Sequence, residues 1–206
     1  MYTGRCSHGV SSSRPFVHIS GVNDDLVDEM VMMTCDSCGA ATDPYGRHLP
    51  PPQPDGFTVP SLAVDALVLR KGDDSPELLL IRRGQDPDCG RLALPGGFVE
   101  YGENPDDSVL RELAEETGLT GRNPHPLTIA GHPQRDPRKH VVSIVYLVEV
   151  SIDDVAVAGD DAAEVVWSRI SALPTIHDDA WAFDHGRIVH DVLQHPWVIK
   201  QGIVND

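Results

Sequence analysis

The sequence lacks several features that would assign it to a large class of proteins. It contains no run of about 18 apolar residues, which a membrane-spanning helix requires, and the segment 1–17 lacks the apolar core of a secretory signal. No segment repeats along the chain, so a solenoid or propeller of repeats is excluded. We therefore expect a cytoplasmic protein that has one main domain and no membrane partner.

Basic residues are also scarce. The chain has 16 Lys and Arg against 32 Asp and Glu, which gives a formal net charge of −16 and a pI near 4.8. Such a balance argues against a surface that wraps nucleic acid, because phosphate binding normally draws on a basic patch. It does not exclude a small phosphorylated substrate, since a bound metal ion reverses the local sign of charge.

Only four cysteines are present, and two of them form a C-x2-C-Gly pattern at Cys35 and Cys38. This pattern is typical of a zinc knuckle, for which Cys6 and His8 could supply the second pair of ligands. The C-x-H spacing of that second pair is unusual. Structural zinc, an unstructured tail with incidental thiols, and a redox function therefore all stay open.

Composition changes near residue 56. We expect residues 1–56 to form a poorly structured extension that ends in a Pro-rich linker, and residues 57–206 to form the compact domain. Apolar runs with Gly, Pro or Asp at their ends predict strands over Leu62–Leu69, Glu77–Arg82, Leu127–Ala130, Val141–Val150 and Glu164–Trp167, and a helix over Asp178–Leu193. With a further helix between the second and third strands, this order predicts an α/β fold in which helices cover both faces of a mixed sheet.

That further helix carries three carboxylates. Glu112, Glu115 and Glu116 lie at i, i+3 and i+4, so they share one side of a helix and could hold divalent cations there. Asn104 suits the N-cap, and Gly118 suits the position after the last turn. The alternative is a solvated acidic face. The opposite, apolar side should comprise Leu110, Leu113, Ala114 and Thr117.

The glutamates belong to a longer pattern. Residues 97–119 fit G-x5-E-x7-R-E-U-x-E-E-x-G-U, where U is a bulky apolar residue. This string resembles the signature of the Nudix hydrolases, and the resemblance extends from about Val59 to the C-terminal helix. It implies an α/β/α sandwich and the hydrolysis of a nucleoside diphosphate linked to another moiety. We call residues 97–119 the Nudix box.

The resemblance also implies roles within the box. Glu112, Glu115 and Glu116 would be ligands of Mg²⁺, together with the backbone carbonyl of Gly96. An all-oxygen site suits such a hard cation, and Mn²⁺ could substitute for it. Arg111 would organise the site by pairing with a box carboxylate such as Glu103, whereas a plain surface ion pair would leave it nearly dispensable.

The general base is predicted less directly. In the ADP-ribose branch of the family it commonly comes from an acidic residue on a loop after the box. Asp161 and Glu164 are the candidates here, and in other branches a box glutamate serves instead.

Three features outside the box resemble the ADP-ribose pyrophosphatase branch. Pro133 lies 15 residues after Gly118, and the segments 135–143 and 181–185 resemble parts of bacterial and archaeal members. The implied reaction converts ADP-ribose and water into AMP and ribose 5-phosphate. Arg135 and Arg138 could bind phosphate, and Tyr146 could stack on adenine, although each also suits an ordinary surface or core position.

Other functions fit the same box. NADH or an oxidised nucleoside triphosphate could be the substrate, and the Cys35 and Cys38 pair gives the NADH branch some support. A non-catalytic regulator that senses ADP-ribose is a further alternative, although the box is intact here. Membership of the ADP-ribose branch would also make a homodimer a common arrangement.

Overall fold

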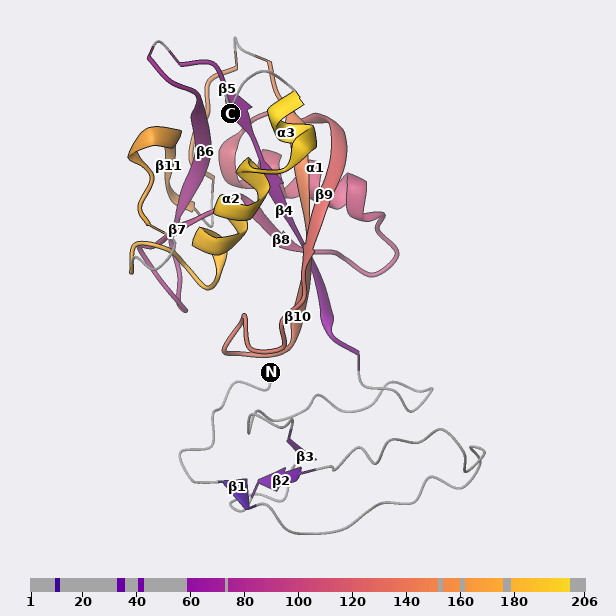
Figure 1. Ribbon diagram of the computed structural model, residues 1–206. Coiled ribbons are helices and arrows are strands. Elements are labelled where there is room, and N and C mark those ends of the chain that lie inside the picture. The colour runs from indigo at the N-terminus through magenta and orange to yellow at the C-terminus, as the bar shows by residue number, and fades with distance from the viewer. Residues whose placement is uncertain are drawn as a thin grey trace. The chain divides into compact units, whose positions relative to one another are not determined.

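The computed structural model describes residues 10–11, 33–35, 41–42, 59–72, 74–151, 154–159, 162–175 and 179–200 (Figure 1). The chain forms two compact units, of which one comprises residues 1–60 and 136–140 and the other residues 61–135 and 141–206. In the first unit three short strands pair antiparallel in the order β1-β2-β3, and they are β1 (Val10–Ser11), β2 (Met33–Cys35) and β3 (Ala41–Thr42).

Among its described residues, the second unit contains two four-stranded sheets and the helices. Its strands are β4 (Ser61–Leu67), β5 (Leu69–Arg70), β6 (Glu77–Arg83), β7 (Leu92–Ala93), β8 (Gly96–Phe98), β9 (Arg122–Ala130), β10 (Val141–Glu149) and β11 (Ala162–Arg169). Its helices are α1 (Pro105–Thr117), α2 (His185–Leu193) and α3 (Pro196–Lys200), with a 3-10 turn, η1 (Ile170–Ala172), after β11.

The larger sheet is mixed. Its order is β8-β4-β10-β9, where β10 runs parallel to β4 and the other two pairings are antiparallel. The second sheet has the order β11-β6-β5, with β7 also paired to β6, and all of its pairings are antiparallel. Residues 94–97, which we call the catalytic loop because they contain Gly96 and lead into the Nudix box, connect β7 in one sheet to β8 in the other.

The two faces of the sheets bury different sets of apolar side chains. Neighbouring residues of β10 alternate between them, because successive side chains of a strand point to opposite faces. Val145 and Leu147 belong to a core cluster that includes Val189 of α2, whereas Tyr146 and Val148 belong to one that includes Leu113 of α1. Helices therefore cover both faces, and the predicted α/β fold with a mixed sheet is confirmed.

The acidic helix begins and ends where its sequence predicts. Asn104 is the N-cap, and its side chain accepts a hydrogen bond from the backbone N–H of Asp106. Gly118 ends the helix in the left-handed region, at φ 67°. The predicted apolar side was partly wrong: Ala114 is exposed, whereas Val109 and even Glu116 are buried, because this side of the helix packs against β4 and β8.

Two other predicted elements have different bounds. β9 starts at Arg122, five residues before the predicted start, because it is an edge strand and tolerates Pro124 and Pro126 there. The C-terminal helix starts only at His185. Before it, Trp181 forms a β-bridge with Leu92, and turns and a bend surround this bridge, so the backbone there is not helical.

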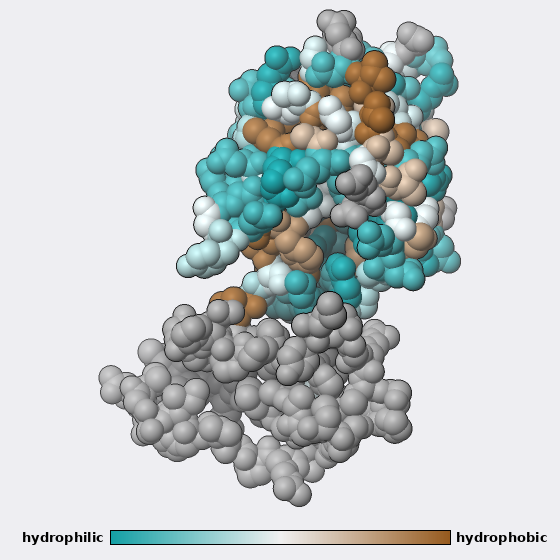
Figure 2. Space-filling view, turned by 180° about the vertical axis from the view of Figure 1, so that it is seen from behind, coloured by the Kyte–Doolittle hydropathy of each residue, from teal (hydrophilic) through white to brown (hydrophobic). Residues whose placement is uncertain are grey.

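The surface combines hydrophilic and apolar residues. In Figure 2 the hydrophilic residues spread over the coloured face, and apolar residues gather in separate patches between them. Within the described ranges, no helix has the length and apolar character to span a membrane. The large apolar side chains with the greatest exposure in the second unit are Leu62, Phe98, Tyr101, Ile129, Val155, Val157 and Trp197.

Candidate active site

The three box glutamates of α1 have different environments. Glu116 is buried, with 9% of the residue exposed, and Glu112 has a largely buried side chain. The side chain of Glu115 is mostly exposed. The helix therefore points two carboxylates toward the sheet and one toward solvent.

Two glycines of β8 allow the backbone to approach these carboxylates closely. The N–H of Gly96 donates to Oε2 of Glu116 over 2.9 Å. A Cβ atom at Gly97 would lie only 2.4 Å from the carboxylate carbon of Glu112. Any larger residue at position 97 would therefore push Glu112 away, which explains why the catalytic loop ends in a glycine pair.

Arg111 links the start of the box to α1. Its guanidinium donates to both carboxylate oxygens of Glu103, from Nε over 2.8 Å and from Nη2 over 3.0 Å, so the predicted pairing of Arg111 with Glu103 is confirmed. Nη1 donates to Glu112 and Glu115, over 2.8 and 3.0 Å. Nη2 also donates to the carbonyl of Phe98, over 3.2 Å.

The side-chain hydrogen bond from Arg111 lowers the pKa of Glu103 to about 2, so this carboxylate stays ionised at neutral pH. Burial has the opposite effect deeper in the site. It raises the pKa of Glu112, and it raises the pKa of Glu116 to about 8 despite the hydrogen bond from Gly96. Too little positive charge lies near the buried Glu116 to keep its carboxylate ionised at neutral pH.

The charges around Arg111 do not balance. When ionised, Glu103, Glu112, Glu115 and Glu116 carry four negative charges, and Arg111 carries one positive charge, so the group has a net charge of −3. A divalent cation would reduce this excess, and its preference for oxygen ligands fits the carboxylates and the nearby backbone.

The carboxylates of the box glutamates do not point to one common position, as the ligands of a cation would. Over the part of the chain that the structure describes, no three His, Cys, Asp or Glu side chains form a metal-binding group. Arg111 holds Glu112 and Glu115, while Glu116 bonds to Gly96 on the other side. The carboxylates of Glu112, Glu115 and Glu116 are suitable metal ligands by their chemistry. That they bind a metal ion stays a prediction.

A loop after β10 covers the end of α1. The N–H of Val157 donates to the carbonyl of Thr117 over 2.8 Å, and the N–H of Gly159 donates to the carbonyl of Glu116 over 3.0 Å. These bonds satisfy two carbonyls at the C-terminal end of the helix. A Cβ atom at Gly159 would lie 1.7 Å from the carbonyl oxygen of Glu115, so only glycine allows this contact.

The two candidate bases follow this loop. Asp161 lies outside the described residues. Glu164 lies on β11, where its carboxylate accepts a hydrogen bond from Nε of Arg82 over 3.0 Å and is largely exposed. Its role as the general base stays a prediction.

A buried polar group lies behind the catalytic loop and was not identified from the sequence. Asp65 of β4 is buried and accepts a hydrogen bond from the hydroxyl of Ser143 on β10. Its charge contributes to the raised pKa of Glu116. A signal existed, because both residues interrupt otherwise apolar strand segments, where a polar residue needs a buried partner.

The predicted substrate residues have different interaction partners. Arg135 has a nearly buried side chain and pairs with Asp184, with bonds of 2.8 to 3.1 Å. Arg138, in the first unit, pairs with Asp136. Pro133 is half-buried in the loop between β9 and β10.

Tyr146 requires a correction, because it is 3% exposed and packs in the core beneath α1 rather than presenting an open ring to a base. Burial, together with a hydrogen bond to Asp106, raises the pKa of Tyr146 to about 12.

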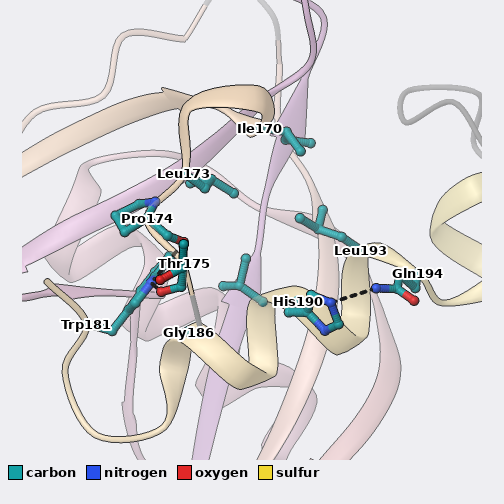
Figure 3. A pocket seen from close by; sticks show the side chains of 10 residues that line it. Ile170, Leu173, Pro174, Thr175, Trp181, Gly186, His190, Leu193 and Gln194 are labelled. Atoms are coloured by element: carbon teal, nitrogen blue, oxygen red, sulfur yellow. Dashed lines mark hydrogen bonds between the residues drawn. The ribbon is translucent and has the colours of Figure 1, made fainter. Parts of the chain in front are cut away.

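A hollow of about 450 Å³ lies on the other side of the sheets, between the segment 170–175 and α2 (Figure 3). Its lining is largely apolar and includes Leu173, Trp181, Val189 and Leu193. His190 and Gln194 lie at its edge and contact each other over 2.9 Å. None of the box glutamates lines it, so we do not assign it to the site at α1.

The predicted zinc ligands Cys6, His8 and Cys38 lie outside the described residues. For Cys35 the structure describes only its place in β2. Structural zinc therefore stays a prediction.

Comparisons with known proteins give one consistent family. The family model of the NUDIX domain matches residues 59–192. An ADP-ribose pyrophosphatase of Methanocaldococcus jannaschii is 41% identical over 135 residues, which cover 66% of this chain and 74% of the relative. The ADPR responsive transcriptional repressor NtrR of Acinetobacter baylyi is 27% identical over 69% of this chain and 55% of its own length.

Solved structures resemble the chain as well. The NUDIX domain of Shewanella oneidensis NrtR, crystallised with ADP ribose, has a TM-score of 0.58 and is 28% identical. The match covers 67% of this chain and 89% of that one. Residues 59–192, which the family model matches, contain α1, β8 and the loop between β10 and β11.

Proposed function

Because this chain belongs to the NUDIX family, we propose that it is a magnesium-dependent hydrolase that converts ADP-ribose and water into AMP and ribose 5-phosphate. The family match and the pyrophosphatase relative confirm the predicted enzyme class, a pyrophosphohydrolase. The observation that carries the proposal is the approach of Gly96 and Gly97 to Glu116 and Glu112, which brings carboxylates and backbone to one place.

The proposed metal ligands are Glu112, Glu115, Glu116 and the carbonyl of Gly96. Bound Mg²⁺ would neutralise phosphate charge and lower the pKa of a water molecule. The excess negative charge and the raised pKa of Glu116 both favour a cation at this place. Mn²⁺ could substitute, because it accepts the same oxygen donors.

The chain's own residues position the reaction. Arg111 holds the box loop against α1 through Glu103, which keeps the glycines of β8 beside the glutamates. In the reaction the oxygen of water forms a bond to one phosphorus atom, and the bridging oxygen leaves with the other phosphate group. A carboxylate accepts the proton of the water, and Asp161, Glu164 or a box glutamate such as Glu115 is proposed for this role.

The choice of ADP-ribose is supported by the relative from Methanocaldococcus jannaschii and by the ADP ribose in the NrtR domain. Pro133, Arg135 and Arg138 stay the proposed substrate residues. Nε and Nη2 of Arg135 already donate hydrogen bonds to Asp184, so its proposed contact with a phosphate would be made by Nη1.

A substrate panel tests the proposal. ADP-ribose, NADH, sugar nucleotides and nucleoside triphosphates, including oxidised ones, are incubated with the full chain and Mg²⁺, and the released mononucleotide is measured. We expect ADP-ribose to give the highest kcat/KM. The Glu116→Gln variant, purified in the same way, is the control: any hydrolysis it shows measures contaminating hydrolase. Preference for NADH or a triphosphate would contradict the substrate, and no hydrolysis of any compound would contradict the enzyme.

A second candidate is a protein that binds ADP-ribose without cleaving it. The similarity to the ADPR responsive repressor and to the NrtR domain favours this alternative. Calorimetry with ADP-ribose in the panel buffer distinguishes the two, because a binding protein would give a stable complex and no AMP.

Three further predictions belong to the whole protein. We propose a structural zinc ion at Cys6, His8, Cys35 and Cys38, a homodimer, and a cytoplasmic location. Metal quantification on protein purified without chelators tests the zinc, and light scattering tests the dimer.

A further inference from the structure

The segment 181–185 resembles the ADP-ribose branch, but the proposed function gives it no role. In the structure it runs beside β7. The N–H of Leu92 donates to the carbonyl of Ala180 over 2.7 Å, and the N–H of Ala182 donates to the carbonyl of Leu92 over 2.9 Å. The segment is therefore attached to the strand that leads directly into the catalytic loop.

Side chains from two other parts of the second unit hold the end of this segment. Asp88 accepts a hydrogen bond from the N–H of Phe183 over 3.0 Å. Nε and Nη2 of Arg135 donate hydrogen bonds to the carboxylate of Asp184, and the Arg135 side chain is only 6% exposed. The residue that follows Asp184 consequently has a fixed position at the start of α2.

That residue is His185, and it contacts the catalytic loop. Its Nδ1 accepts a hydrogen bond from the N–H of Leu94 over 3.1 Å, and both residues are buried. Since Nδ1 accepts, the proton of the neutral ring is on Nε2. Burial lowers the pKa of His185 and outweighs the opposing charges of Asp65 and Asp184, so the ring is neutral at pH 7.

The catalytic loop is thus tied at three consecutive residues. Leu94 bonds to His185 on the α2 side of the sheets. The carbonyl of Pro95 accepts a hydrogen bond from the N–H of Ala66 in β4 over 2.8 Å. Gly96 bonds to Glu116 of α1. The loop therefore connects the two helices that cover opposite faces.

We propose that His185 is a positioning residue that fixes the catalytic loop from the α2 side and so sets where Gly96 and Gly97 meet the glutamates. The proposal rests on the proposed function, because the loop matters only if the site at α1 is catalytic. A small shift is sufficient, since a misplacement of about 1 Å by a residue away from the reacting atoms can lower turnover about a hundredfold.

The test compares two substitutions of His185 with one matched control. His185→Leu removes the acceptor, whereas His185→Asn can retain an acceptor oxygen near the position of Nδ1. Val192→Ala removes apolar packing from the buried face of the same helix and leaves the imidazole of His185 in place. The readouts are kcat and KM for the preferred substrate, thermal unfolding, and hydrogen exchange of the Leu94 amide.

We expect His185→Leu to lower kcat about a hundredfold, with a smaller change in KM, and to expose the Leu94 amide to exchange. His185→Asn should recover most of the kcat and the protection. Val192→Ala should lower the unfolding temperature while kcat stays close to that of the wild type. A His185→Leu variant with unchanged kcat, or an Asn variant as impaired as the Leu variant, would contradict the proposal.

Amide exchange keeps the two hypotheses separate. A wild-type Leu94 amide that exchanges freely would overturn the role of His185, even if His185→Leu does not fold. A protected Leu94 amide in a protein that hydrolyses nothing would instead contradict the proposed function and leave the contact intact.

Discussion

The α1 side and the α2 side of the second unit use different interactions. On the α1 side, Arg111, Glu112, Glu115 and Glu116 form a network of charges with an excess of carboxylates. On the α2 side, apolar residues pack against the sheets, and the buried His185 is neutral. Both sides hold the loop 94–97, one through Glu116 and the other through His185.

The difference separates two requirements of such a site. Charge excess on the α1 side costs stability, because buried carboxylates without a cation are poorly solvated. Apolar packing and a neutral hydrogen bond on the α2 side carry no such cost. The charged side is therefore suited to binding a cation, and the apolar side is suited to keeping the loop in place while charge changes.

The largest effect should come from removing the buried carboxylate on the α1 side. Glu116→Gln should lower kcat by about 10³-fold or more while the fold is retained, because the substitution is isosteric and removes a proposed metal ligand. Steady-state kinetics and circular dichroism measure both quantities.

The matched control is Glu149→Gln, which changes an exposed glutamate at the end of β10 that contacts Asn123. It should leave kcat unaltered. Glu116→Gln activity close to that of the wild type would remove the basis of the proposed metal site.

The next effect concerns the loop that covers the end of α1. Gly159→Ala should lower kcat about a hundredfold, because its Cβ would collide with the carbonyl of Glu115 and force the loop away from the helix. Gly131→Ala is the control, since its Cβ would lie 3.7 Å from Val142, an ordinary contact. Equal kcat for both variants would show that the loop contact has no effect on turnover.

A smaller effect should appear in how the free energy of unfolding depends on pH, because the α1 side carries the titrating carboxylates. The pKa of Glu116 is raised from 4.5 to about 8 in the folded chain. Between these values the folded state binds more protons than the unfolded state, so without divalent cations the free energy of unfolding should fall as pH rises from 5 to 8. At about 1.4 kcal/mol per pKa unit the fall should reach a few kcal/mol.

Urea unfolding in EDTA at several pH values measures this fall. Glu116→Gln should reduce it, and Mg²⁺ should oppose it at pH 8. Glu103 acts in another window: its pKa is lowered to about 2, so its stabilising contribution is present above pH 4.5 and lost as pH falls toward 2. A pH dependence between 5 and 8 that is identical in wild type and Glu116→Gln would contradict the origin we give.

The smallest effect should come from Tyr146 in the core of the α1 side. Tyr146→Phe should lower the free energy of unfolding by about 1 kcal/mol, because it removes the hydrogen bond to Asp106. KM for the substrate should not change, since the ring is buried. A large rise in KM with unchanged stability would restore the predicted stacking role of this residue.

Local patterns were sufficient to predict parts of the fold and site. Both caps of α1 were predicted from Asn104 and Gly118, because caps depend on neighbouring backbone groups. The pairing of Arg111 with Glu103 followed from the box pattern. In contrast, β7 and β8 were not predicted, because these short segments become strands only by pairing with β6 and β4.

The start of α2 and the bonding partner of His185 were also beyond the sequence patterns. Trp181 has the spacing of a helical apolar residue, but it forms a bridge to Leu92 and lies between turns and a bend instead of in a helix. His185 bonds to a residue 91 positions away, and no local pattern reports such a pairing.

By itself the sequence determined the box, the bounds of α1 and the α/β class, because spacing along one helix or strand is set by backbone geometry alone. Tertiary structure decided which carboxylate is buried, which glycine is indispensable and what holds the catalytic loop. These outcomes depend on contacts between residues distant in the chain, as in the bond from Leu94 to His185, and on the burial that those contacts create.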